Sequence, residues 1–129
     1  MKSRIVLVEP GKVAQITEME LSLENIQKVV GGMFQAVYPW KDKAALVCND
    51  EGKLLGMSPN RALEDAKGHV YDIVCGTFFI CGVGDEDLTG LTTEQARLYL
   101  KKFRNPQKIA RRPDGTLLII EYRDFTKGG

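Results

Sequence analysis

The sequence predicts an α+β fold, a single compact domain with a mainly antiparallel sheet built from hairpins and with two principal helices. Short apolar segments separated by turn-forming residues predict the hairpins, and two segments with helical spacing of apolar residues predict the helices. The length of 129 residues suits one hydrophobic core. We therefore assign residues 1–129 to one domain and expect residues 124–129 to form a flexible tail.

A hairpin and a short helix are expected at the amino-terminal end. The apolar residues 4–8 end at a Pro-Gly turn, and residues 12–19 alternate well enough to be the partner strand. Ser22 is a suitable helix N-cap, and the two glycines at 31–32 suit the left-handed end of a helix. The apolar residues between them share one helical face: Leu23, Ile26, Val29 and Val30.

The next segment predicts an aromatic strand followed by a hairpin. Aromatic or methyl side chains recur at every second position, which on a strand places them on one face: Phe34, Ala36, Tyr38 and Trp40. Pro39 puts this strand at a sheet edge or at its own end. Residues 44–48 form an apolar strand, and the turn sequence NDEG predicts its reversal into residues 53–55.

Turn and capping signals organise the second half of the chain. The sequence SPNRAL at residues 58–63 predicts the start of a short helix with a serine or asparagine cap. Residues 71–83 are the most hydrophobic segment, and Gly76 and Gly82 predict a bulge or a close backbone approach there. Thr92 and Gln95 form a capping box for a second helix. Residues 108–112 and 116–123 flank a Pro-Asp-Gly turn and predict a final hairpin.

The composition is that of a folded protein, with 43% hydrophobic and 27% charged residues. A net charge of +1 gives no global attraction to nucleic acid or to a membrane. No apolar run approaches the roughly 20 residues of a membrane span, so we expect a cytoplasmic protein with no membrane partner. The three cysteines form no CxxC pair and there is one histidine, so we expect buried, reduced thiols, no metal site and no cofactor.

Enzyme motifs are absent from the sequence. It contains no GxSxG, HExxH or phosphate-binding GxxxxGK[ST] pattern. A hydrolase using Asp85, Glu86 or His69 is the weakest of the alternatives, because acids after a glycine are most often a solvated loop. We therefore expect a binding protein and not an enzyme.

Arg61 is the residue that raises the question of a ligand. In the first turn of a helix a cation lies at the unfavourable end of the helix dipole, so local stability does not explain it. One explanation is a salt bridge with Asp50, Glu51 or Asp72. The other is a bound phosphate or carboxylate held by the guanidinium, with aromatic walls for a base. The second explanation predicts a ligand-binding site made of Asn49, Asn60, Arg61, Thr77, Tyr38 and Trp40.

A basic segment near the end of the chain is the second candidate surface. Residues 97–112 contain seven cations and no acid. A patch of this kind attracts a nucleotide, an acidic protein surface or, less favoured here, nucleic acid. The alternative is that the lysines complement the end of a helix dipole while the arginines are solvated. Beyond Arg97, the patch consists of Lys101, Lys102, Arg104, Lys108, Arg111 and Arg112.

Two stretches carry a resemblance to a known family, VYPWKDKAALVCNDEGKLLGMSPNRAL and YDIVCGTFFICGVGDEDLTGLTTEQARLYLKKF. Taken together they resemble a family of small proteins of phages and mobile elements, described as a domain of unknown function and numbered thirty-eight forty-six. The resemblance extends from about residue 5 to residue 103 and leaves the basic hairpin unplaced. It implies no reaction or catalytic residues, but a setting in which small accessory proteins act by binding.

Two functions follow as expectations. The first is binding of a small anionic ligand, such as a nucleotide signal of host defence, at the Arg61 site; a subunit junction of a homo-oligomer is one place for that site. The second is a protein–protein module that inhibits or modulates a host factor through the basic helix and the carboxyl-terminal hairpin.

Overall fold

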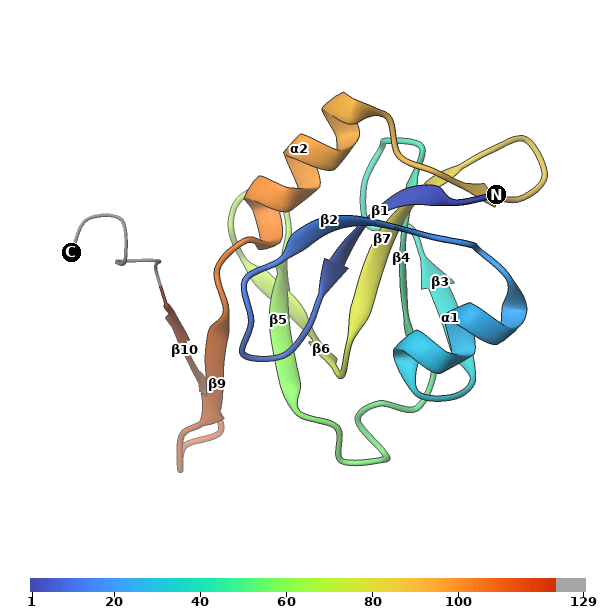
Figure 1. Cartoon of the computed structure of the whole chain (residues 1–129). Helices are drawn as coiled ribbons and strands as arrows, with labels where there is room; N and C mark the ends of the chain where they lie inside the picture. Colours follow the sequence, from blue (N-terminus) through green and yellow to red (C-terminus); the bar gives the residue numbers. More distant parts are fainter. Residues whose placement is uncertain (123–129) are drawn as a thin grey trace.

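The centre of the fold is an antiparallel sheet with the strand order β2-β1-β7-β4-β3, to which the short β8 adds at the end of β7 (Figure 1). This computed structural model describes residues 1–122, so the tail expected at 124–129 lies outside the described residues. The bounds of these strands are β1 Ser3–Val8, β2 Gln15–Met19, β3 Phe34–Val37, β4 Ala44–Asn49, β7 Phe78–Val83 and β8 Leu88–Thr89.

Two antiparallel strand pairs and two helices complete the fold. Strands β5 (Pro59–Glu64) and β6 (Val70–Cys75) form one pair, and β9 (Gln107–Arg111) and β10 (Leu117–Glu121) form the other. The helices are α1, Leu23–Val30, and α2, Thr93–Phe103. The fold is therefore α+β with mainly antiparallel strands, as the sequence predicts. Neither of these two helices in residues 1–122 has the length and apolar character needed to cross a membrane.

The core has two sides because successive side chains of a strand point to opposite faces. On one face of the central sheet, Phe79 of β7 packs with Ile26 and Val30 of α1. On the other face, Phe78 of β7 packs with residues of α2 and of the β5–β6 pair, including Phe103. The central sheet is thus covered on both sides, and β5–β6 with α2 forms the second layer (Figure 1).

The helix boundaries follow the capping signals in the sequence. The Ser22 hydroxyl accepts a hydrogen bond from the Asn25 N–H, and Gly31 ends α1 with a left-handed backbone. At α2, Thr92 and Gln95 exchange the two hydrogen bonds of a capping box. Both predictions are confirmed.

Two predicted elements around SPNRAL are wrong. Residues 53–55 do not form a strand. The chain makes successive turns through residues 50–56, where the Leu55 N–H donates to Glu51 O at 2.9 Å. Residues 59–64 form strand β5 instead of a helix, because they pair with β6 across the second layer. Tertiary pairing overrides the helix-like local signal of a capped turn.

The prediction of one aromatic face on a strand through Trp40 is also wrong. Strand β3 ends at Val37, at the edge of the sheet, which agrees with the position expected from Pro39. Phe34 packs on the α1 side of the sheet, Trp40 packs on the α2 side, and Tyr38 is 61% exposed. The chain leaves the strand before Tyr38, so the alternation of the sequence does not continue as one face.

Gly76 and Gly82 have different roles within the predicted apolar segment. Gly76 has a φ of +87° and turns the chain from β6 of the second layer to β7 of the central sheet. Gly82 lies inside β7, where a Cβ atom would be 2.5 Å from Gly90 O. The close backbone approach is therefore confirmed at Gly82, whereas Gly76 separates two strands.

Candidate functional site

Arg61, the centre of the predicted ligand site, lies inside the protein. Its side chain is 1% exposed and points from β5 toward the end of α2 and the β1–β2 turn. The Nε donates to Phe103 O at 3.0 Å, and Nη2 donates to Lys12 O at 2.7 Å. The third acceptor is Asn60, whose Oδ1 lies 2.8 Å from Nη1. Carbonyl and amide oxygens bind this guanidinium, and none of the three acids expected as salt-bridge partners does so.

Asn60 extends the same hydrogen-bond network. Its Nδ2 donates to Val8 O at 2.9 Å and to Gly76 O at 2.8 Å. Together, Asn60 and Arg61 connect β5 to the end of β1, the β6–β7 turn and the last residue of α2. Both side chains are used inside the fold, and the structure does not present either of them to a ligand in solvent.

The charge of Arg61 is balanced by the end of a helix. The last carbonyl groups of a helix have no partner within it and carry the negative end of its dipole. Phe103 is the last residue of α2, so Arg61 lies at the favourable end of that dipole. Burial lowers the pKa of the Arg61 guanidinium to about 10, and the negative charge of Glu121 opposes that shift. Arg61 is therefore positively charged at neutral pH.

The other predicted ligand residues do not come together. Asn49 Nδ2 donates to Val30 O at 3.1 Å, and its Oδ1 accepts from the Glu51 N–H. Thr77 follows the β6–β7 turn and is half-buried. Trp40 packs on Tyr99, with ring centroids 4.6 Å apart, and Tyr38 is exposed. Asn60 and Arg61 thus lie together, with Thr77 next to the Gly76 carbonyl that Asn60 binds, whereas the hollow at Asn49 and the hollow at Trp40 include none of the other predicted residues.

Asn49 does line a hollow of about 360 Å³ between β4 and β6. The charged groups around this hollow are Asp50, Glu51, Asp72 and Lys53, and Lys53 is paired with Asp72. Three carboxylates and one ammonium group make the surroundings acidic. Because like charges repel, this hollow is unfavourable for an anionic ligand.

The β9–β10 hairpin stands beside the second layer, at the edge of the molecule (Figure 1). The Gln107 side chain joins it to the core, because Oε1 accepts from the Ala62 N–H of β5 at 2.8 Å. A hollow of about 450 Å³ lies between the hairpin and β6, with Val70 and Tyr71 on one side and Ile109 and Leu117 on the other. The hairpin is therefore attached to β5 through β9, and a hollow separates it from β6.

The two faces of the hairpin differ. Leu117 lines the hollow next to β6, so the odd-numbered residues of β10 face the core, and the even-numbered residues face outward. On the outward face, Leu118 is 38% exposed and Ile120 is 44% exposed, and Leu117 on the other face is 36% exposed. Tyr122, which follows β10, is 49% exposed and lines a further hollow with Lys108 and Pro10. Lys108 pairs with Ile120 in the ladder and shares this face. The outward face is thus apolar with a cation beside it.

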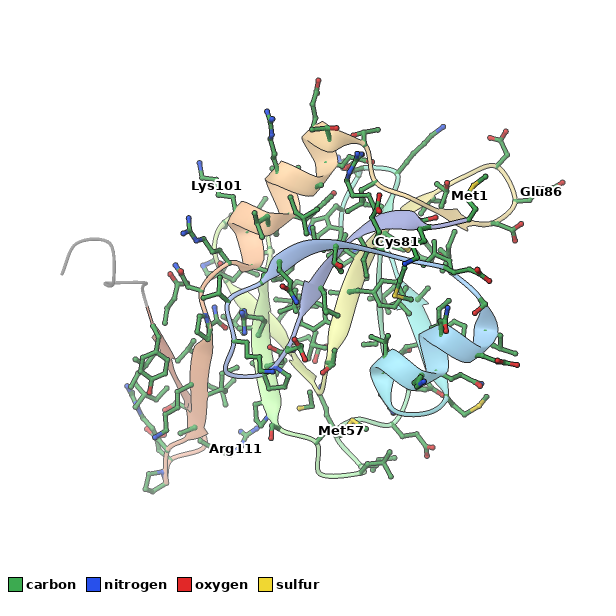
Figure 2. The ribbon with its side chains drawn as sticks, in the orientation of Figure 1. Met1, Met57, Cys81, Glu86, Lys101 and Arg111 are labelled. Carbon is green, nitrogen blue, oxygen red and sulfur yellow. The ribbon has the colours of Figure 1, made fainter. Side chains whose placement is uncertain are left out.

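The predicted basic patch is exposed but spread out. All six of its cations are exposed, and they follow the end of α2 and strand β9. Figure 2 shows Lys101 on α2 and Arg111 at the opposite end of the hairpin, so the patch is a band along this side of the molecule. Arg111 donates to Gly115 O at 2.9 Å, within the hairpin turn. The band runs beside the apolar residues of β10, along β9.

Sequence reasoning missed the apolar residues of β10. The hairpin was predicted, but Leu118, Ile120 and Tyr122 were not considered for binding. The signal was available, because the run LLIIEY lacks the alternation of a strand with one buried face. A strand that is apolar at successive positions and lies outside the core leaves large side chains exposed.

These features define an α+β protein with a two-sided core and an attached hairpin. The chain belongs to the family described as Domain of unknown function (DUF3846), whose family model matches residues 1–104. The matched range includes both helices and strands β1 to β8, and it ends before β9. The resemblance to a domain of unknown function is thereby confirmed. Comparison with curated proteins and with solved structures finds no match.

Proposed function

We propose that this protein is a protein-binding module that contacts an acidic partner through its carboxyl-terminal hairpin. The observation that carries the proposal is the exposure of Leu118 and Ile120 on β10, and of Tyr122 just after it, beside Lys108. Exposed apolar residues beside a band of cations are typical of an interface with an acidic protein surface.

The setting of Arg61 favours this function over binding of a small anion. A ligand-binding arginine needs donors directed toward a space that a ligand can enter. The donors of Arg61 are used on Phe103 O, Lys12 O and Asn60 Oδ1, and the hollow at Asn49, which Arg61 does not line, is acidic. The cations of the hairpin are, by contrast, on the surface.

The partner we propose is a protein of the cell that hosts a phage or a mobile element. This setting comes from the resemblance to small accessory proteins of phages and mobile elements, which act by binding. The hairpin lies outside the range that the family model matches, so a partner that binds it need not be shared by the family.

The experiment uses a synthetic peptide probe, a blocked heptamer of alternating glutamate and valine or isoleucine. We expect it to bind the intact chain in fluorescence anisotropy, and to bind more weakly as salt rises. The double variant Arg111→Glu/Arg112→Glu is expected to weaken binding at least about tenfold, which corresponds to roughly 1.4 kcal/mol.

A matched control separates local charge from net charge. The double variant Lys28→Glu/Lys67→Glu makes the same change in net charge at exposed positions on α1 and the β5–β6 turn. It is expected to retain binding of the peptide. Equal losses in both variants, or tight binding of the corresponding lysine peptide, would contradict the proposal.

Binding of nucleotides and of nucleic acid is tested separately, because each would support another function. A ligand at one hundred times its Kd adds about 2.7 kcal/mol to the stability of the folded state, which thermal unfolding detects. We expect no such shift with a nucleotide panel and no tight complex with duplex DNA or single-stranded RNA. A nucleotide that raises the Tm strongly in the wild type would favour the small-ligand function instead.

A further inference from the structure

Two hydrogen bonds at the ends of β10 show which of its backbone groups point toward β9. The Tyr122 N–H donates to Pro106 O at 2.8 Å, and Thr116 O accepts from the Arg112 N–H at 2.7 Å. The even-numbered residues of this segment therefore direct their backbone groups toward β9. Because an antiparallel ladder alternates, Leu117 and Ile119 direct their N–H and C=O groups to the opposite edge.

No strand pairs with that edge within residues 1–122. The five residues of β10 pair with β9 without a register shift, so the edge is regular. Proteins usually protect an edge strand with a proline, a lysine or a bulge. The sequence LLIIE contains no proline or lysine, and its ladder contains no bulge. An edge of this kind is a template for another strand.

We infer that the acidic partner binds by adding an extended segment to β10 as an antiparallel strand. This inference rests on the proposed function and specifies its mode of recognition. The backbone of the added strand exchanges hydrogen bonds with Leu117 and Ile119, which supply affinity without a sequence requirement. Specificity then comes from the side chains on the two faces of the added strand.

The neighbours on β10 define the chemistry of the added strand. On the outward face, Leu118 and Ile120 favour apolar residues beside them. On the inner face, Leu117 lies between the added strand and Arg111, its partner in the ladder. Two strand spacings separate the added strand from Arg111, about 10 Å. Long side chains cover this distance, so an acidic residue beside Leu117 meets the guanidinium. The occupant is an extended segment in which apolar and acidic residues alternate.

Proline variants test the backbone contact directly. Ile119→Pro removes an N–H group at the outer edge and leaves the donors toward β9 in place, since Ile119 does not direct its N–H to β9. We expect this variant to weaken binding of the alternating glutamate peptide at least about tenfold. Ile119→Ala controls for the lost side chain, and it is expected to bind within about threefold of the wild type. Equal binding by all three proteins would overturn the inference.

The peptide itself provides a second test that does not depend on folding of a variant. Two forms of the probe carry N-methyl groups on alternate residues, one form on the odd positions and the other on the even positions. Strand addition predicts that one form loses binding and the other retains it, because only alternate N–H groups face β10. Equal binding of both forms, or equal loss by both, would overturn strand addition.

The outcomes separate this inference from the proposed function. If the glutamate peptide binds and Arg111→Glu/Arg112→Glu weakens it, while neither proline nor N-methylation matters, the proposed function stands and strand addition is wrong. If the peptide does not bind the wild type, both are wrong. Sedimentation of the protein alone measures its oligomeric state. A dimer that Ile119→Pro dissociates would show that the edge of β10 binds a second copy of this chain, and this result would overturn the inference.

Discussion

The Nε of Arg61 donates a hydrogen bond to the main-chain oxygen of Phe103, 3.0 Å away, and so joins strand β5 to the end of α2. Phe103 O is one of the carbonyl groups that a helix leaves without an internal partner. The arginine satisfies this carbonyl and places a positive charge at the negative end of the helix dipole. Its role in the described residues is to hold the second layer together.

Replacement of Arg61 is expected to lower the free energy of unfolding. Arg61→Ala leaves Phe103 O and Lys12 O without their donor and creates a cavity, which costs on the order of 3–5 kcal/mol. Arg61→Lys keeps the charge but loses the fork of donors, and about 1–3 kcal/mol is expected. Urea unfolding measures both. Arg97→Ala, an exposed control on α2, should change stability by less than about 0.5 kcal/mol. An Arg61→Ala protein as stable as the wild type would contradict this assignment.

Acid should weaken the link between α2 and the segment before β4. The Tyr99 hydroxyl donates to Asp42 at 2.7 Å, and this bond lowers the pKa of Asp42. A lowered carboxyl pKa contributes stability above the unfolded value near 3.8, and this contribution is lost as pH falls through the lower folded value. Tyr99→Phe should therefore cost more at pH 7 than at pH 2.

The expected difference is under about 1 kcal/mol, because Asp42 is exposed and water screens its charge. Chemical unfolding at several pH values measures it. Tyr38→Phe is the control, since that ring is exposed to solvent. A Tyr99→Phe cost that is constant with pH would show that Asp42 does not depend on the hydroxyl.

Gly82→Ala should distort the junction of β7 with the segment after β8. The added Cβ would lie 2.5 Å from Gly90 O, and a backbone oxygen cannot move away as a flexible side chain can. We expect a loss of roughly 1–3 kcal/mol in the free energy of unfolding. Gly11→Ala meets no atom within 4 Å and should cost about 1 kcal/mol, from its positive φ alone. If Gly82→Ala costs no more than Gly11→Ala, the close approach is not a constraint.

The base of the hairpin depends on Gln107. Its Oε1 accepts from the Ala62 N–H at 2.8 Å, so Gln107→Ala leaves that N–H without its acceptor. Hydrogen exchange should become about tenfold faster at the Ala62 amide, while the amides of β7 keep their protection. Lys108→Ala is the neighbouring control, because Lys108 is exposed. Unchanged exchange at Ala62 in Gln107→Ala would show that the hairpin is held in another way.

The three cysteines should differ in their reaction with a thiol reagent. Cys81 is fully buried, and burial raises its pKa to about 12, so it should react only on unfolding. Burial also raises the pKa of Cys75, but this residue is half-buried and should react first in the native protein. Mass spectrometry of the labelled peptides gives the order, and Cys75→Ser should remove the fast phase. A fast native reaction at Cys81 would contradict its place in the core.

Local signals predicted the elements that depend on neighbouring residues. The Ser22 cap, the capping box at Thr92 and the final hairpin each need only a few consecutive residues, and the structure has all three. The first hairpin is likewise confirmed, with β2 starting later than expected, at Gln15. The α+β class follows from the number and type of these elements.

Features that depend on contacts between distant residues could not be predicted from the sequence. The acceptors of Arg61 lie 42 and 49 positions away, so its partners and its burial were not visible in SPNRAL. The same holds for β5, which is a strand because β6 lies beside it. The candidate interface is a different case, because the apolar run of β10 is local but its exposure depends on where the hairpin stands.

Strand β7 lies between the two halves of the central sheet. It pairs with β1 on one side, where Val8 meets Phe78, and with β4 on the other, where Val47 meets Phe79. Without it, β1–β2 and β3–β4 are two separate hairpins with no common sheet. During synthesis the two hairpins therefore cannot join into one sheet until β7 has left the ribosome. Closing such long loops makes folding slower than in a helical bundle of the same size.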